Sequence, residues 1–488
     1  MKHILLLYSI CLLMVSSCHE PYNATSINEL PAIYPNYIDV TIPYNIAPLN
    51  FAMADYSFSY IRATIKDADG DSIVAQGTEA NFDIEQWHQL LSQNKGKDIS
   101  VSVCAQKNDK WYSFRNFNIS ISSFSLSDKQ ITYRRIAPGY GQYGAMGIYK
   151  RNVSDFSEQP IIVNSLSEGM CVNCHNSNRT NSQQFTFHVR GVNGATIVGN
   201  NNNVDILESI NKITNSSLVY PSWHSTGRFI AFSTNQTAQM FHSHDINRIE
   251  VYDKKSDIVV YDVINNRLIT DSIIMHNDMS ENCPAFSANG DSLYFISAPT
   301  RNYPSEAKQQ KYDLYRIAFD SISGHIYGNI DTIFSASDNG KSISWPSTCP
   351  RNQFITFAVA DYGYFSIWHQ ESDIYIADLH SGVIRPINEI CSNRAESYPK
   401  WSTDGRWLLF VSRRDDGLHS RLYISQLKDN GTFTKPFMLP QINPKQYYLN
   451  QFDSFNTPDF VHDNNNTDAK SIDRKLKNSD RKYINANN

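Results

Sequence analysis

The stretch Pro399-Lys400-Trp401-Ser402-Thr403-Asp404-Gly405-Arg406-Trp407-Leu408-Leu409-Phe410 has the pattern of a strand, a tight turn and a second strand. Asp404-Gly405 is a turn dipeptide, because glycine adopts positive φ angles without steric cost. The apolar and aromatic residues on both sides of this turn are typical of strands. One such hairpin does not define a fold, but its recurrence along the chain does.

The same hairpin pattern occurs four times. The other three copies begin at Pro221, Pro284 and Pro346, which gives spacings of 63, 62 and 53 residues. A third strand follows each hairpin, in the segments 257–261, 313–317, 373–377 and 421–424. Units of four strands that repeat at such a period predict a β-propeller. In the third copy Cys349-Pro350-Arg351-Asn352 replaces the glycine turn, which leaves that turn in doubt.

A fifth proline of this kind, Pro458, lies 59 residues beyond Pro399. We expect its strand, 456–461, to close the ring by completing a blade that begins with the strands 185–188 and 195–198. This count gives five blades over residues 191–462, or six if one blade has gone unrecognised. The fold class we expect is therefore all-β.

The remaining sequence also favours strands, since the 488 residues include 28 Tyr and 25 Phe. Alternating segments between residues 32 and 136 predict a β-sandwich of immunoglobulin or fibronectin type III style, with one helix at 84–93. The acidic segment Asp67–Asp71 lacks the ligand series of an EF-hand, so a hairpin turn is the better interpretation. Residues 463–488 are polar and predicted to be disordered.

The segment Cys171-Val172-Asn173-Cys174-His175 is C-x-x-C-H, the attachment sequence of a c-type haem. In such a site the two thiols bind the porphyrin covalently and the histidine, here His175, is the proximal iron ligand. We therefore predict haem c as a cofactor, held in a connector over residues 137–190. The alternatives are a structural disulfide or a zinc site, and zinc would need four protein ligands although no second C-x-x-C exists.

The sixth position of the iron is open. Methionine or histidine would suit electron transfer, whereas a vacant position would suit ligand binding or sensing. Met146 and His188 flank the motif and are candidates, and so is His242 in the propeller. A further possibility is a position elsewhere in the propeller.

Two insertions stand out in the propeller repeats, residues 235–256 and 361–369. Both fall between the second and third strands of their units, so we expect them on the same face of the disk. Loops gathered there predict a surface that docks an unknown partner protein. His242 and His244 could form a metal pair, but H-x-H is a weak signal and solvated loop histidines are the simpler interpretation.

The N-terminus resembles the signal peptide of a bacterial lipoprotein. The apolar run Ile4–Val15 is too short for a permanent transmembrane helix, and Val15-Ser16-Ser17-Cys18 resembles a lipobox. This resemblance implies removal of residues 1–17, acylation of Cys18 and a tether over 18–31. An ordinary secretory peptide is the alternative. We expect a lipid-anchored protein of the bacterial cell envelope, facing the periplasm or the outer membrane, where haem c is attached.

The repeated pattern P-x-[W/F]-[S/H]-x-[D/N/T]-G-x-x-[L/I]-x-F resembles TolB-like and WD40-like propellers. The joint layout of lipobox, β domain, one C-x-x-C-H and propeller resembles a group of bacterial lipoproteins often labelled TolB-like or cytochrome c biosynthesis related. The resemblance implies an architecture more than a mechanism.

Several functional classes are disfavoured. The net charge of −5 is dispersed, which argues against nucleic-acid binding. The sequence contains no G-x-S-x-G, H-E-x-x-H or Walker loop, so no catalytic residue is assigned. We expect electron transfer or redox and ligand sensing by the haem, with the propeller as a docking platform. The alternative is a haem-independent scaffold in envelope assembly, and a peroxidase-like enzyme ranks last. Disulfides among the other mature cysteines are an alternative in such a compartment, but their wide and irregular spacings favour buried free thiols: Cys104, Cys283, Cys349 and Cys391.

Overall fold

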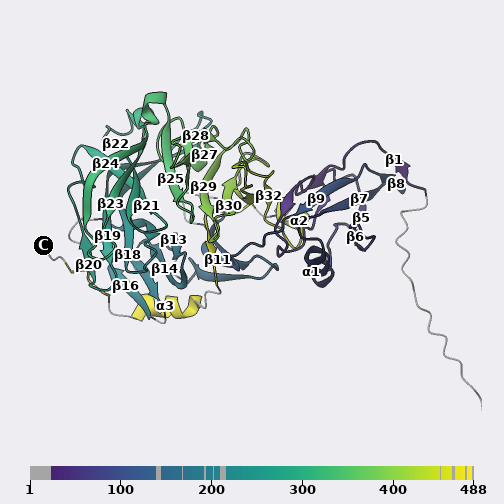
Figure 1. Cartoon of the computed structure of the whole chain (residues 1–488), viewed down its shortest axis with the longest axis horizontal. Coiled ribbons are helices and arrows are strands. Elements are labelled where there is room, and N and C mark those ends of the chain that lie inside the picture. Colours follow the sequence, from purple (N-terminus) through teal and green to yellow (C-terminus); the bar gives the residue numbers. More distant parts are fainter. Residues whose placement is uncertain are drawn as a thin grey trace, which may run out of the picture.

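The computed structural model describes residues 23–138, 144–166, 169–191, 194–201, 203–208, 216–450, 452–463, 468–478 and 481–485. Over these residues the chain forms an N-terminal β domain and a β-propeller that lie end to end (Figure 1). Strands dominate both parts, so the all-β class and the propeller are confirmed. None of the helices in these ranges is long and apolar enough to span a bilayer.

Six four-stranded antiparallel sheets, counted over the described residues, form the blades of the propeller. Five blades are continuous in sequence, and their strands run outward from the axis. Blade 1 consists of β13 (Val172–Asn178), β14 (Asn181–Val189), β15 (Ala195–Asn200) and β16 (Asn203–Glu208). Blade 2 consists of β17 (Leu218–Trp223), β18 (Phe229–Phe241), β19 (Ile249–Asp262) and β20 (Arg267–Ile269). Blade 3 consists of β21 (Met279–Phe286), β22 (Ser292–Pro299), β23 (Asp313–Phe319) and β24 (Ile326–Phe334). Blades 4 and 5 are β25 (Ser342–Thr348), β26 (Phe354–Ala360), β27 (Asp373–Asp378), β28 (Ile384–Pro386); and β29 (Glu396–Trp401), β30 (Trp407–Ser412), β31 (Arg421–Gln426), β32 (Phe437–Met438).

The sixth blade joins the two ends of the propeller sequence. Its inner strand is β33 (Ser454–Val461), followed by β10 (Gln130–Ile136), β11 (Met146–Asn152) and β12 (Glu158–Val163). β33 and β10 pair antiparallel, from Gln130 opposite Val461 to Ile136 opposite Ser454. Each inner strand contacts the inner strands of both neighbouring blades, so the ring is complete.

The expected count of five blades is therefore corrected to six, the alternative that was left open. The closing strand pairs with β10 rather than with the segments 185–188 and 195–198, which belong to blade 1 together with β13. The sequence pattern does not predict blade 1 as a separate blade, because β13 carries neither the proline–tryptophan signature nor a glycine turn. Residues 137–190 are accordingly not a connector but parts of blades 6 and 1.

The four hairpins recognised in the sequence are β17–β18, β21–β22, β25–β26 and β29–β30, as predicted. The doubtful third turn closes in the same way as the others. Asn352 adopts φ 55° and its N–H donates to the carbonyl of Cys349 at 3.0 Å, just as Gly405 donates to Ser402 at 2.8 Å. Asparagine replaces glycine here because it tolerates the left-handed region better than most residues.

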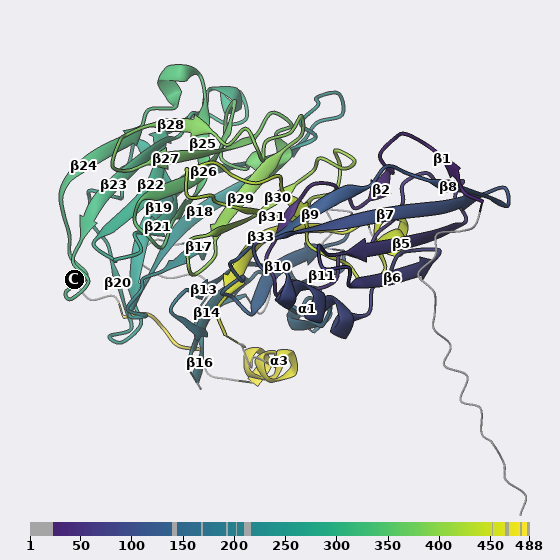
Figure 2. The ribbon, with the colours of Figure 1, turned by 45° about the vertical axis from the view of Figure 1, so that its right-hand side comes forward.

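The N-terminal domain differs from the expected two-layered sandwich. One sheet has the order β1-β8-β7-β5-β6, in which β9 also pairs with β7 and β3 pairs with β9, and a separate ribbon pairs β2 with β4 (Figure 2). Asp67–Asp71 is a hairpin turn between β5 and β6, and the predicted helix is α1 (Ile84–Gln93), which Asp83 caps. The strands are β1 (Thr25–Ser26), β2 (Ile33–Tyr34), β3 (Thr41–Ile42), β4 (Ala52–Met53), β5 (Tyr60–Lys66), β6 (Ser72–Gly77), β7 (Asp98–Lys107), β8 (Lys110–Ser113) and β9 (Phe117–Ile121).

The two parts share one continuous hydrophobic core, which runs from the N-terminal sheet into blades 4, 5 and 6. Polar contacts reinforce this junction. The indole N–H of Trp407 in blade 5 donates to the carbonyl of Ser125 at 3.1 Å, and Asp128 accepts from the backbone N–H of Thr403 at 2.8 Å. A shared core of this kind fixes the domain against the propeller rather than leaving it on a free linker.

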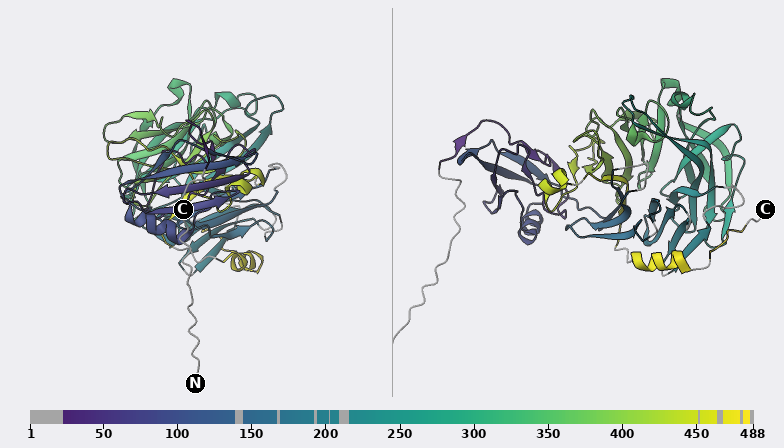
Figure 3. Two further views of the ribbon diagram at one scale, coloured as in Figure 1. Left: turned by 90° about the vertical axis from the view of Figure 1, so that its right-hand side faces the viewer. Right: turned by 180° about the vertical axis from the view of Figure 1, so that it is seen from behind.

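The C-terminal segment was predicted to be disordered, but its described part is ordered. It forms α3 (Ala469–Asn478), which lies against β12 and β16 at the seam between blades 6 and 1 (Figure 3). Ile472 and Leu476 are one helical turn apart and buried, so the helix presents a short apolar stripe within a polar sequence. The other helices are α2 (Pro444–Asn450) and the 3-10 turns Ala307–Gln309, Ser337–Asn339 and Ser366–Trp368.

Replacing Trp407 by alanine should lower the free energy of unfolding by about 3–5 kcal/mol, because it leaves a cavity in the shared core. The side chain of Trp407 is fully buried. Val383→Ala, at a residue that is 58% exposed, is the matched control and should change the value by less than about 0.5 kcal/mol. Equilibrium unfolding in guanidinium chloride measures the free energy of unfolding of both variants and of the unaltered protein. A loss below about 1 kcal/mol for Trp407→Ala would contradict the shared core.

Candidate functional site: the axial channel and its C-x-x-C-H strand

Six residues with left-handed backbone form a ring around the propeller axis. One comes from the inner strand of each blade, with φ between 45° and 55°: Cys174, Tyr220, Cys283, Trp345, Tyr398 and Thr457. The pairing register shifts at the same point in every blade, so each of these residues is part of a β-bulge. Left-handed φ is strained for residues other than glycine, and repetition in all six blades shows that the propeller architecture imposes it.

In five blades a proline follows the left-handed residue, and in blade 1 His175 takes that position. The C-x-x-C-H motif thus coincides with the inner strand of a blade, and Cys174-His175 corresponds to Tyr220-Pro221 in blade 2. This correspondence could have been found in the sequence by aligning the motif with the x-Pro dipeptides of the other repeats.

The channel inside this ring has three connected sections. The narrow middle section, here called the waist, has a volume of about 60 Å³ and all six left-handed residues line it together with His175. It shares wall residues with a cavity of about 320 Å³ on the side of the loops between second and third strands, the loop-face vestibule. On the opposite side, where the hairpin turns lie, a turn-face vestibule of about 230 Å³ shares Pro221, Pro284 and Pro346 with the waist.

The motif residues face this channel. Cys171 and Cys174 both line the loop-face vestibule and are free thiols, and His175 lines the waist beside Cys174. All three are at most 9% exposed. Burial raises the pKa of the Cys174 thiol, an effect that Arg190 and Arg134 oppose, and burial lowers the pKa of His175 to about 3. The imidazole is therefore neutral at physiological pH.

Neither ring nitrogen of His175 has a partner at good hydrogen-bond geometry among the described residues, although both are buried, and the backbone of Thr132 lies near enough to raise the pKa of the ring. A buried polar atom without a partner is unfavourable by roughly 1–3 kcal/mol. The ring nitrogens are thus available to a ligand that enters the channel.

The three candidates for a distal iron ligand lie elsewhere. Met146 is buried between blades 6 and 1, where its sulfur accepts from Arg134 at 3.4 Å. His188 is buried within blade 1, and its Nδ1 lies 3.0 Å from the hydroxyl of Thr196. His242 lies on the β18–β19 hairpin with Nε2 3.3 Å from Glu250. The structure places none of them in the wall of the vestibule or the waist.

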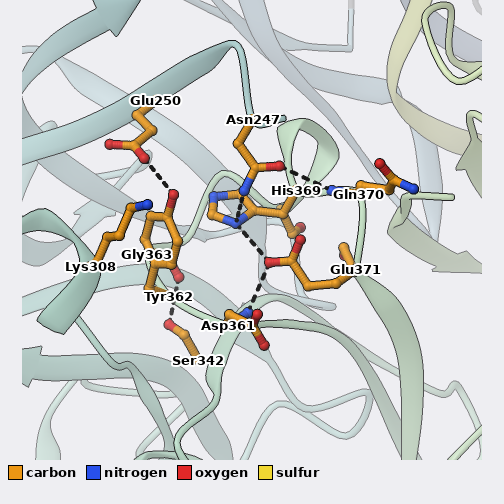
Figure 4. A network of polar contacts seen from close by, with 12 residues as sticks. Asn247, Glu250, Lys308, Ser342, Asp361, Tyr362, Gly363, His369, Gln370 and Glu371 are labelled. Atoms are coloured by element: carbon orange, nitrogen blue, oxygen red, sulfur yellow. Dashed lines mark hydrogen bonds and ion pairs between the residues drawn. The ribbon is translucent and has the colours of Figure 1, made fainter. Parts of the chain in front are cut away.

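The two insertions do meet on one face. Residues 237–239 of the first insertion and Phe365, Ile367 and Trp368 of the second line the loop-face vestibule. Beside it the insertions share a polar cluster, in which His369 Nδ1 lies 3.4 Å from Asn247 Nδ2 and 3.1 Å from Glu371 Oε1 (Figure 4). Tyr362 donates to Glu250 in the same cluster.

This polar cluster is not a metal centre. No group of three or more His, Cys, Asp or Glu side chains among the described residues is arranged to hold a metal ion. His242, one of the two histidines of the H-x-H segment, lies 3.3 Å from a carboxylate oxygen of Glu250. The remaining described cysteines are free thiols: Cys104, Cys283, Cys349 and Cys391.

Comparison with known proteins gives no family. No family model matches the chain, and no curated protein matches it. Similar solved structures include a Mycobacterium tuberculosis puromycin-hydrolyzing peptidase (10% identity, 83% of this chain and 57% of that chain, TM-score 0.37). Another is the β-propeller domain of Myceliophteria thermophila Cps50 (10% identity, 66% of this chain and 92% of that chain, TM-score 0.35). A third is an oligogalacturonate lyase from Vibrio parahaemolyticus (9% identity, 59% of this chain and 85% of that chain, TM-score 0.32). The chain spans little more than half of the peptidase. The propeller assignment rests on the six sheets themselves.

The polar cluster predicts a pH-dependent contribution to stability. Burial raises the pKa of Glu371, but the hydrogen bond and charge of His369 outweigh it and lower the pKa to about 2. A carboxylate whose pKa is depressed on folding stabilises the protein above its unfolded pKa of about 4.3 and loses this effect as the pH falls toward 2. Glu371→Gln should therefore lower the free energy of unfolding by ~1 kcal/mol at pH 6, and the difference should shrink steadily between pH 5 and pH 3.

Chemical denaturation at a series of pH values measures this difference. Gln370→Ala is the control, because it alters the neighbouring side chain without removing a titrating group. A difference between Glu371→Gln and the unaltered protein that stays constant from pH 6 to pH 3 would contradict the assignment.

Proposed function

We propose that this protein is a lipid-anchored, extracytoplasmic propeller that carries one covalent c-type haem in its axial channel. The observation that carries the proposal is the position of the motif: both free thiols and the imidazole of His175 face one connected channel. When bound, the haem would supply a redox-active iron with a site for an axial ligand.

The residues of the chain fit this group in three respects. Cys171 and Cys174 are free and accessible from the same vestibule, as two thioether bonds require. His175 is neutral, and its ring nitrogens have no partner at good hydrogen-bond geometry among the described residues, so a ring nitrogen is available to ligate iron. Aromatic side chains, which suit a flat macrocycle, line the vestibule around the thiols.

The walls of the channel favour sensing over electron transfer. Apart from His175, the described residues that line the waist and the loop-face vestibule include no histidine and no methionine. These two residues are the usual sixth ligands in electron-transfer haems, whereas an open position binds an external ligand. We infer that the haem serves to bind or sense a small ligand and that the propeller relays this state to a partner protein.

A haem-independent scaffold is the second candidate, and one observation favours it. Cys174-His175 occupies the position of an x-Pro dipeptide in each other blade, so the propeller repeat alone accounts for the backbone of the motif. On this alternative the propeller is an interaction platform in envelope assembly.

The arrangement of the two parts supports an anchored function. The first described strand, β1, lies at the end of the N-terminal domain that points away from the propeller (Figures 1 and 2). Cys18 precedes it and lies outside the described residues. An anchor there would hold the propeller away from the membrane. Phe241 and Ile246 on the β18–β19 hairpin are 58% and 69% exposed and offer apolar contacts for a partner at the loop face.

Expression together with a haem c maturation system should yield one haem per chain. A pyridine haemochrome spectrum and the intact mass measure this, and Cys171→Ser/Cys174→Ser should lose both signals. Cys283→Ser is the matched control, since Cys283 has the same left-handed position in blade 3 but lies outside the motif. The reduced protein should bind carbon monoxide, which a six-coordinate iron with two protein ligands resists.

His175→Pro separates the two candidate functions. Proline stands at this position in the other five blades. The melting temperature of the haem-free His175→Pro variant should therefore be no lower than that of the unaltered haem-free protein. Under the haem proposal this variant should lose most of its haem or change its spectrum. A chain that folds fully, lacks haem under maturation conditions and retains partner binding would overturn the haem proposal and leave the scaffold.

Cys18→Ala should move the protein from the membrane fraction to the soluble envelope fraction. Fractionation and metabolic labelling with radioactive palmitate measure this in a Gram-negative host, because only an acylated Cys18 retains lipid. Cys104→Ala serves as the control for an unrelated cysteine. Membrane association that survives Cys18→Ala would contradict the lipid anchor.

A further inference from the structure

A second ring of residues lines the turn-face vestibule, one step beyond the ring of prolines and His175. Each inner strand contributes the next residue along the chain: Asn176, Ser222, Ala285, Ser347, Lys400 and Asp459. Four of these side chains are uncharged. The two charged ones, Lys400 in β29 and Asp459 in β33, have opposite signs and lie on the neighbouring blades 5 and 6.

These two opposite charges do not pair. The Lys400 ammonium makes no hydrogen bond or ion pair with Asp459 or with any other described residue. Asp459 accepts through Oδ2 from Asn176 Nδ2 at 2.9 Å and from the backbone N–H of Ser177 at 3.1 Å, and no described residue donates to its Oδ1. Burial raises the pKa of Asp459, and the charge of Lys400 opposes this effect, so the two groups lie close enough to interact. Because buried charges are unfavourable unless they are paired, a molecule that contacts both would stabilise them.

Arg179 partly encloses the same vestibule. It lies in the turn between β13 and β14 of blade 1, and its Nη2 donates to the carbonyl of Thr348 in blade 4 at 2.9 Å. Blades 1 and 4 are opposite each other in a ring of six, so this side chain crosses the vestibule. Its positive charge also acts on Asp459. Shielding from bulk water strengthens hydrogen bonds between charged groups in such a cavity.

Large apolar side chains form much of the remaining wall. Four of them line the vestibule and are each at most 7% exposed: Trp223, Phe286, Trp401 and Phe460. The cavity volume of about 230 Å³ is below the ~300–1,000 Å³ typical of pockets for drug-sized ligands. The vestibule therefore suits one small molecule that combines opposite charges with an apolar body.

We propose that the turn-face vestibule binds a free α-amino acid with an apolar side chain. The Lys400 ammonium binds the carboxylate of the ligand, Asp459 Oδ1 accepts a hydrogen bond from its ammonium group, and the aromatic residues contact its side chain. An α-amino acid carries both charges on one carbon atom, whereas neither end of a peptide carries both. This site does not rest on the haem, because no residue of the C-x-x-C-H motif lines the vestibule.

Three matched ligands test the requirement for both charges on the unaltered protein. L-Leucinamide lacks the carboxylate of L-leucine, and N-acetyl-L-leucine lacks its ammonium group. With the full-length protein in detergent, isothermal titration calorimetry should show that L-leucine binds roughly tenfold or more tightly than either derivative, since each charge-assisted hydrogen bond contributes to affinity. L-Phenylalanine and its two corresponding derivatives extend the test to an aromatic side chain. If neither amino acid binds, or if the amino acids and their derivatives bind equally, the proposal is overturned.

Variants locate the binding. Lys400→Met should weaken L-leucine roughly tenfold and leave L-leucinamide unchanged, so that the two ligands bind alike. Asp459→Asn should weaken L-leucine and leave N-acetyl-L-leucine unchanged. Lys341→Met is the control, because Lys341 pairs with Asp361 and lies outside the channel.

Circular dichroism checks the fold of each variant. Equal losses for L-leucine and L-leucinamide in Lys400→Met would overturn the contact between Lys400 and the carboxylate. Since the comparison of the three ligands needs no variant, the proposal stays falsifiable even if one variant fails to fold. A chain that never acquires haem but prefers L-leucine to both derivatives would refute the proposed cofactor and retain this site.

Discussion

Closure of the propeller ring is the constraint on which the rest of the structure depends. Every blade buries both faces of its sheet against neighbours, so an open ring would leave two apolar faces in water. The pairing of β33 with β10 prevents this by joining the C-terminal strand to strands that precede the first blade by sequence. The seam so formed has its own core, in which Met146 and Ile148 of blade 6 pack with Phe187 of blade 1. α3 covers the same seam through Ile472.

Closure also explains the geometry of the channel. Six inner strands converge on one axis, and each is bulged at the same level, where a left-handed residue turns toward the centre. The strain of these six residues is offset by the packing of the blades around them. The waist is therefore narrow and rigid, while the vestibules on both sides are wider. A chemical group placed at the waist is held by the whole ring rather than by one loop.

The C-x-x-C-H motif has a double role in this arrangement. Its backbone is the inner strand of blade 1 and serves the fold, while its two cysteines are free thiols and line the channel together with His175. In the other five blades a proline fills the position of His175, and in three of them an aromatic residue fills the position of Cys174, as at Tyr398-Pro399. Blade 1 thus departs from the repeat at the point where its side chains reach the cavity, which is where function is expected to override a structural pattern.

The sequence by itself determined the all-β class, the propeller, four of its hairpins and the helix at 84–93, because these depend on local turn chemistry and on apolar periodicity. It also singled out Cys171, Cys174 and His175. Only the tertiary structure decided the number of blades, since blade 6 is assembled from strands more than 300 residues apart and blade 1 lacks the repeated signature. The surroundings of the motif, including Arg413 and Trp345, likewise come from blades distant in sequence. Such contacts are set by how the blades pack around the axis, and no local pattern records that packing.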